Sequence, residues 1–238
     1  MQQLSYDPHD PWFDVYGWEI AAQVITFENI YGLDSEASTV ARQGDHTVIA
    51  CSQLTWAGGQ ERCEGSARIE VTRTGDGIEI VVSAQHTEKI RCVKLLVRGL
   101  APGEIIGAFW GRSPIRGAGA VLSYPTPLHT PLVFLAQAGS EQAYFQSLDD
   151  RVRAKRFAFY ERDGAVVAEL IFEELAPQMS PSVTAPTWRI GRTGDPGAIA
   201  EAHRLHIERS YNLQPWESRT MRHVSRYPVV VSGIGQHR

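Results

Sequence analysis

Aromatic and polar side chains gather in one proline- and glycine-rich stretch of the chain, residues 107–131. Trp110 and Tyr124 offer ring faces that could stack on the C–H groups of a sugar. Arg112 and His129 lie in the same stretch and could bind hydroxyl groups. These four residues are therefore the candidates for carbohydrate contact. For the two rings, ordinary packing within a loop is favoured over contact with sugar or with another domain.

Two histidines, His203 and His206, stand three residues apart in a helical segment, with Glu201 and Glu208 nearby. This spacing could chelate a metal, but it is common by chance and the sequence offers no evident third ligand. A solvated helix face is the favoured interpretation. We expect no metal and no cofactor.

The three cysteines, Cys51, Cys63 and Cys92, have no metal-ligand spacing. Their odd number and the absence of a signal sequence at the polar N-terminus favour free thiols. Cys51 and Cys92 lie in strand-like runs, where a thiol is usually a small buried apolar group. Cytoplasmic localisation is the expectation.

Period-two alternation dominates the chain from about residue 15 to residue 191. Residues 66–73 and 78–83 alternate polar and apolar around a Gly-Asp-Gly turn, which is typical of a β-hairpin. Residues 155–161 and 165–172 repeat the pattern around Asp163-Gly164. About ten to twelve such strands predict a mainly β fold of two packed antiparallel sheets.

Two stretches interrupt this pattern and one helix follows it. Residues 107–131 and the proline-rich residues 176–186 are predicted to be a functional loop and a spacer. Asp195 is a good N-cap and Pro196 suits the first helical position. The apolar stripe of that helix is expected on Ala198, Ile199, Ala202 and Leu205.

The charge pattern excludes some classes of partner. The net charge of −4 argues against nucleic acid, which requires a concentrated basic field. The basic run 151–156 lies beside Asp149 and Asp150, so a solvated strand edge is favoured over a basic partner-binding patch. The two aspartates are expected to cap a turn. No apolar run approaches the roughly 20 residues that span a bilayer.

The order of these features resembles a known arrangement. Many short strands, a Gly/Pro-rich loop with aromatics, then residues 143–150 and a strand at Lys155 are similar to the N-terminal galactose-mutarotase-like β-supersandwich of large glycoside hydrolases. Trp188 in a closing strand, a helix, Trp216 and the apolar run 227–232 resemble its junction with a (β/α)8 barrel. Trp188 and Trp56 are expected in the core.

The resemblance implies a division of the chain into three parts. Residues 1–193 would form the β-supersandwich and residues 194–226 a helical connector. Residues 227–238 would begin an absent α/β barrel, because both faces of Val229–Val231 require burial. The barrel would carry the catalytic carboxylates, so no catalytic residue is assigned here.

Acid–base chemistry is the other possibility that the resemblance raises. Mutarotases open a sugar ring with a histidine acid and a glutamate base. Here His86 or His129 could pair with Glu88, Glu104 or Glu141, but no spacing fixes their geometry.

Two hypotheses about function involve carbohydrate, and a third does not. The first is a non-catalytic accessory domain of a carbohydrate-active enzyme, whose partners are carbohydrate or the missing catalytic domain. The alternative is a free-standing aldose-1-epimerase-like enzyme or sugar-binding protein. The third is an intact β-sandwich interaction protein. Analogy of fold does not decide between them.

Overall fold

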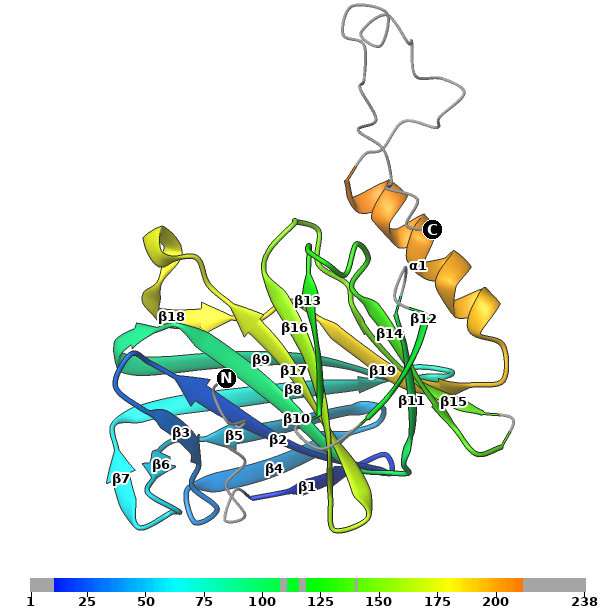
Figure 1. The fold of residues 1–238 in the computed structure, drawn as a ribbon. Coiled ribbons are helices and arrows are strands. Elements are labelled where there is room, and N and C mark those ends of the chain that lie inside the picture. Colours follow the sequence, from blue (N-terminus) through cyan, green and yellow to red (C-terminus); the bar gives the residue numbers. More distant parts are fainter. Residues whose placement is uncertain (1–10, 108–110, 116–118, 140, 212–238) are drawn as a thin grey trace, which may run out of the picture.

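The computed structural model describes residues 11–107, 111–115, 119–139 and 141–211. Within them the chain forms two antiparallel β-sheets and one α-helix, as Figure 1 shows. The mainly β, two-layer fold predicted from the alternating sequence is therefore confirmed. The predicted strand at 227–238, together with residues 212–226 of the connector, lies outside the described residues.

The first sheet has nine described strands, and hydrogen bonds join all but one of them in a single path. In spatial order these are β13 (Ala120–Tyr124), β16 (Lys155–Arg162), β17 (Ala165–Glu173), β10 (Cys92–Leu100), β2 (Trp18–Ile25), β3 (Ile30–Leu33), β6 (Leu54–Trp56) and β7 (Glu61–Cys63), with β1 (Phe13–Val15) paired to β2.

The second sheet has ten described strands. In spatial order these are β12 (Gly111–Pro114), β11 (Gly103–Gly107), β14 (Leu132–Gln137), β15 (Gln142–Ser147), β19 (Trp188–Thr193), β9 (Gly77–Ile90), β8 (Gly65–Arg73), β5 (His46–Cys51) and β4 (Ser38–Gln43), with β18 (Ser180–Thr184) paired to β9.

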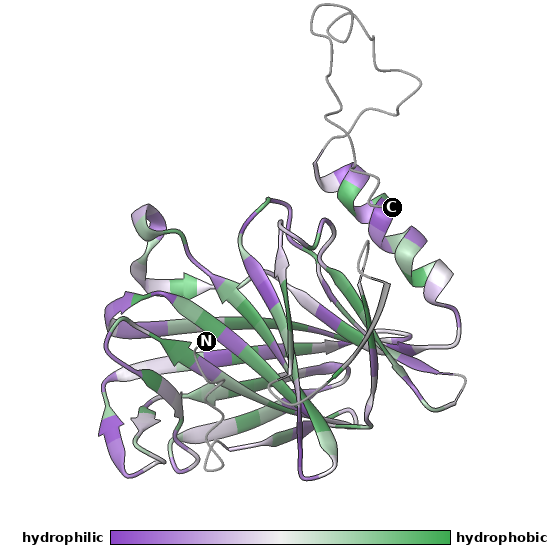
Figure 2. Ribbon diagram, viewed as in Figure 1, coloured by the Kyte–Doolittle hydropathy of each residue, from purple (hydrophilic) through white to green (hydrophobic). Residues whose placement is uncertain are grey.

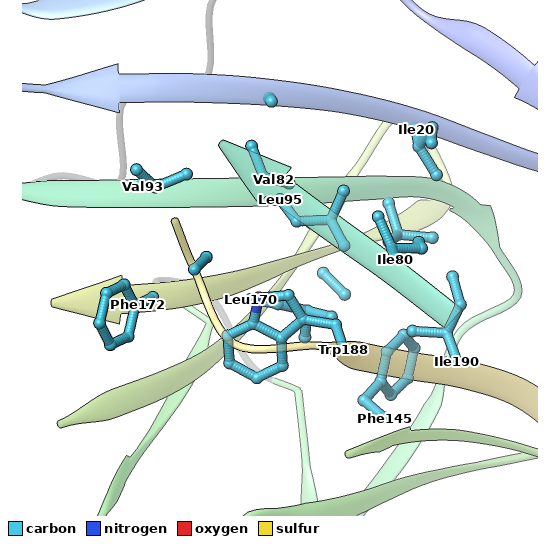
Figure 3. Close-up of a cluster of buried hydrophobic side chains, with 14 of the residues drawn as sticks. Ile20, Ile80, Val82, Val93, Leu95, Phe145, Leu170, Phe172, Trp188 and Ile190 are labelled. Carbon is cyan, nitrogen blue, oxygen red and sulfur yellow. The ribbon is translucent and has the colours of Figure 1, made fainter. Parts of the chain in front are cut away.

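The core lies between the two sheets and is built from alternate residues of their strands. Figure 2 shows the resulting alternation of apolar and polar residues along the ribbon. The Trp188 ring meets Phe157 edge-on, at 5.5 Å between ring centroids and 86° between planes. In the close-up of Figure 3, Trp188 is surrounded by apolar side chains from both layers. Trp188 is 1% exposed, as predicted, but Trp56 is 39% exposed and the prediction for it is wrong.

The strands β9 and β19 approach each other closely where Gly77 faces Gly191. A Cβ atom on Gly191 would lie 2.5 Å from the hydroxyl of Tyr144. Glycine is therefore required at position 191, since a Cβ atom there would collide with Tyr144 of β15 and with the carbonyl of Asp76.

Two predicted interruptions prove to contain strands. β12 and β13 lie within residues 107–131, and the spacer 176–186 contains the 3-10 helix Ala176–Gln178 and β18. These strands were not recognised from the sequence, because each is short and has glycine or proline within it or beside it, which leaves too few alternating positions.

The helix α1 (Pro196–Ser210) begins as predicted, with the Asp195 carboxylate accepting a hydrogen bond from the N–H of Ala198 at 3.0 Å. Its buried face was not predicted correctly. Ala198 and Ala202 are exposed, whereas Ile199 packs on a cluster of Leu132, Phe134 and Tyr144 on the outer face of the second sheet. No described helix has the length and apolar character required to cross a membrane.

His203 lies one turn beyond Ile199 and is 2% exposed, so its predicted position on a solvated helix face is wrong. Neither ring nitrogen has a hydrogen-bond partner among the described residues. Burial, together with the nearby His206, lowers the pKa of His203 to about 4. The ring is therefore neutral when the helix is packed against the sheet.

We expect acid to weaken this packing. Because an unfolded histidine has a pKa of about 6.5, the contribution of neutral His203 is complete above that pH and declines as the pH falls towards 4. A His203→Phe variant should lose this dependence, so its melting temperature should fall less than that of the wild type between pH 7 and pH 4.5. His46→Gln, a change in strand β5, should keep the wild-type profile. Parallel pH profiles for wild type and His203→Phe would contradict the assignment.

Candidate functional site

The four residues expected to contact carbohydrate are not all described. Trp110 lies outside the described residues, and Arg112 lies in β12, in register with Ile106 of β11. His129 is exposed in the connection between β13 and β14. Tyr124, in contrast, is 6% exposed and belongs to the core between the sheets. Its covered ring fits the alternative of loop packing better than a sugar-stacking surface.

Tyr124 packs against a buried ionic cluster. The ammonium group of Lys155 lies 5.1 Å from the centre of the Tyr124 ring and 2.8 Å from the Asp149 carboxylate. Arg153 donates two hydrogen bonds to Asp149, at 2.8 and 2.9 Å. Lys155 is completely buried, so the predicted solvated edge at residues 151–156 is wrong at this position.

The Asp149 carboxylate is the centre of this cluster. Burial alone would raise its pKa, but hydrogen bonds from Arg153 and Lys155 outweigh burial and lower the pKa to about 2. Asp149 also accepts the N–H of Arg151 at 3.1 Å, which confirms the predicted turn cap. Its described partners are the Arg151 N–H and the side chains of Arg153 and Lys155, which hold the β15–β16 connection in place. We therefore assign the cluster to folding.

A hollow of about 530 Å³ lies on the outer face of the second sheet, away from α1. Its floor is a row of residues in register across five strands, which come from the two hairpins β4–β5 and β8–β9 and from the distant strand β18. From β4 to β18 this row comprises Thr39, Ala50, Arg68, Ser83 and Thr184. The neighbouring row adds Ser66, Gln85 and Ser182. We call this surface the polar hollow.

Most residues that line the polar hollow are small, which leaves space above the sheet, and the serines and threonines among them contribute hydroxyl groups. The hydroxyls of Ser83 and Thr184 lie 3.1 Å apart, so each still has hydrogen-bonding capacity for a ligand. Arg68 is the one charged residue among those that line the hollow. Its Nε donates a hydrogen bond to Glu70 at 2.6 Å, which holds the guanidinium in place. The two terminal nitrogens can still donate to a ligand, beside the hydroxyl groups.

The polar hollow was not identified from the sequence. The alternation of residues 66–73 predicted only a strand of a hairpin, in which Ser66 and Arg68 are two of the polar positions. One signal was present: the outward positions 66, 83 and 85 are two serines and a glutamine, small or uncharged polar residues beside a single arginine at 68.

His86, one of the two candidate acids, contacts a backbone N–H, an aromatic ring and a thiol, and its contacts support the fold. Its Nδ1 accepts the N–H of Glu88 at 3.0 Å, and its ring lies 4.5 Å from that of Tyr31. The other nitrogen is 3.8 Å from the Cys63 thiol. Burial raises the pKa of Cys63, so this pair is not an activated nucleophile.

The three cysteines and the possible metal ligands complete the list of candidate site residues. All three cysteines are free, and Cys51 and Cys92 are buried, as predicted. Within the described ranges no three His, Cys, Asp or Glu side chains are grouped as a metal site would require.

No protein-family model and no curated protein matches the chain. Among solved structures it is similar to a GH36 α-galactosidase from Geobacillus stearothermophilus, with a TM-score of 0.44 and 12% identity over 67% of this chain. A 4-α-glucanotransferase from Thermococcus litoralis matches with a TM-score of 0.47 and 9% identity over 80% of this chain. The chain spans 25% and 30% of the length of these two proteins.

A galactose mutarotase-like protein from Lactobacillus casei is also similar, with a TM-score of 0.41 and 8% identity, over 74% of this chain and 86% of that one. The described sheets, of nine and ten strands, themselves form the large two-layer antiparallel β-sandwich expected from the sequence.

Proposed function

We propose that this chain is a non-catalytic β-sandwich module of a carbohydrate-active protein and that it contacts sugar through the polar hollow. The supporting observation is the lining of that hollow: hydroxyl and amide side chains in two register rows around a single held guanidinium. A sugar presents hydroxyl groups at similar intervals, and a rigid sheet presents the matching donors and acceptors without reordering.

The chemistry of the lining supports a binding role over a catalytic one. Glycoside hydrolysis uses two carboxyl groups across the scissile bond, and the described residues that line the hollow include no carboxylate or histidine. The one thiol there, Cys51, donates to the carbonyl of Gln53 at 2.8 Å. We therefore place catalysis on a partner domain, and the free thiols are compatible with the cytoplasm as the proposed compartment.

Replacing Arg68 with glutamine should weaken sugar binding about tenfold, because a hydrogen bond to a charged group contributes about 1.5 kcal/mol. The measurement is saturation-transfer NMR followed by calorimetry, using galactose, glucose, a galactose-containing disaccharide and glucuronate as probes.

The matched control is Arg151→Gln, which removes another exposed arginine paired with a carboxylate. It should bind as the wild type does. No binding of any probe by the wild-type protein, or an equal loss in both variants, would refute the proposed site. A panel of nitrophenyl glycosides should give no turnover, and turnover abolished by a substitution in this chain would instead indicate a hydrolytic active site within it.

A further inference from the structure

The strand β4 forms one edge of the second sheet and is exposed along nearly its whole length. It pairs with β5 through a two-residue turn, with Gln43 opposite His46 and Thr39 opposite Ala50. In such a hairpin, alternate residues direct their backbone N–H and C=O groups away from the partner strand. On β4 these residues are Ser38, Val40 and Arg42.

Proteins usually protect an exposed edge by very short strands, prolines, bulges or charged side chains. Of these features β4 has only one, the charged residue Arg42. Among the other described edge strands, β7 has only three residues, including Glu61 and Arg62, and β18 contains Pro181. β4 has six residues without proline, and its pairing with β5 is regular.

The single charged residue of β4 does not protect the edge. Arg42 extends its guanidinium to the backbone carbonyl of Asp14, at 2.7 Å, and so towards the first sheet. At the centre of the strand, Val40 is 47% exposed although it stands in register with the fully buried Ile49. An apolar side chain and backbone groups with no hydrogen-bond partner among the described residues therefore coincide at the middle of this edge.

We propose that β4 pairs with β4 of a second copy of this chain, antiparallel and centred on Val40. In this register Val40 faces its counterpart, and Ser38 faces Arg42 of the other copy. The residues whose N–H and C=O groups point outward on one copy then meet the same groups of the other. No like charges are opposed, and the two valines form the apolar cross-strand pair.

The two-fold axis of this pairing is perpendicular to the sheet. The second sheets of the two copies would join into one, with both polar hollows on the same face and Thr39 of each copy beside the junction. The pairing depends only on the edge and holds whether or not the hollow binds sugar.

The test is the oligomeric state of the full chain, measured by sedimentation velocity over a range of concentration. A single strand pair buries little surface, so we expect a weak dimer with a dissociation constant of about 10–100 µM. Val40→Pro removes an outward N–H that β5 does not use and should raise that constant at least about tenfold.

Val40→Lys, which places a charge on the edge, should give the same result if the proline variant does not fold. Val152→Lys is the matched control, since Val152 is 62% exposed and lies between strands; it should leave the dimer intact. A wild-type chain that stays monomeric up to about 500 µM, or a dimer that folded Val40→Pro and Val40→Lys leave unchanged, would overturn the proposal.

Discussion

Replacing Asp149 with asparagine should lower the free energy of unfolding by about 3–5 kcal/mol, because it leaves Lys155 buried without its counter-ion. Lys155 cannot turn to solvent, since its side chain is completely covered and its ammonium group also donates to the carbonyl of Arg153 at 3.0 Å. Chemical denaturation at pH 7 measures the loss. Asp149 is therefore expected to be the most sensitive carboxylate in the β15–β16 connection.

The adjacent Asp150 provides the control. It is exposed and lies 3.6 Å from Arg151, so Asp150→Asn should change stability by less than about 0.5 kcal/mol. Because the pKa of Asp149 is about 2 in the folded protein and about 3.9 when unfolded, its contribution is present above that range and is lost as the pH falls through about 2. Similar losses from both substitutions would contradict the assignment of Asp149 as the centre of the cluster.

Glu169→Gln should also cost about 3–5 kcal/mol, for the same physical reason on the outer face of the first sheet. Glu169 is completely buried, its carboxylate lies 3.0 Å from the ammonium group of Lys94, and the Tyr160 hydroxyl donates to it at 3.3 Å. The substitution would leave the ammonium group of Lys94 without its carboxylate. Thermal and chemical unfolding measure this loss.

A double variant separates the ion pair from the packing. Lys94→Met with Glu169→Leu replaces both charges by apolar groups and should recover most of the stability lost in Glu169→Gln. Glu161→Gln, on the exposed end of β16, is the surface control and should be nearly neutral. A double variant less stable than Glu169→Gln would show that the charges themselves stabilise this face.

Local sequence patterns predicted the local structure well. The Gly-Asp-Gly and Asp-Gly turns between alternating runs became the β8–β9 and β16–β17 hairpins, because turn chemistry and alternation act within a few residues. The helix start at Asp195 was predictable for the same reason. The burial of His203 and Lys155 was not, since it depends on contacts with strands distant in the sequence, which override the preference of charged and polar side chains for solvent.

The polar hollow shows this limit most clearly. Its floor joins residues 39, 50, 68, 83 and 184, which become neighbours only when five strands take one register. A shift of one residue in any strand would turn its hydroxyl or guanidinium to the core. The sequence-based site was placed in residues 107–131 instead, where loop composition suggested function; of its aromatics, the described one, Tyr124, is in the core.

Sugar binding in the polar hollow is tested most directly by a map of backbone amide shifts in the 15N-labelled chain titrated with the best-binding sugar. We expect the shifts to concentrate on Ser66, Arg68, Ser83 and Thr184. Arg68→Gln should need about tenfold more sugar to reach half of these shifts, whereas Arg151→Gln should titrate as the wild type does. Shifts centred on His129 and its neighbours, with the amides of the polar hollow unchanged, would contradict binding in the hollow.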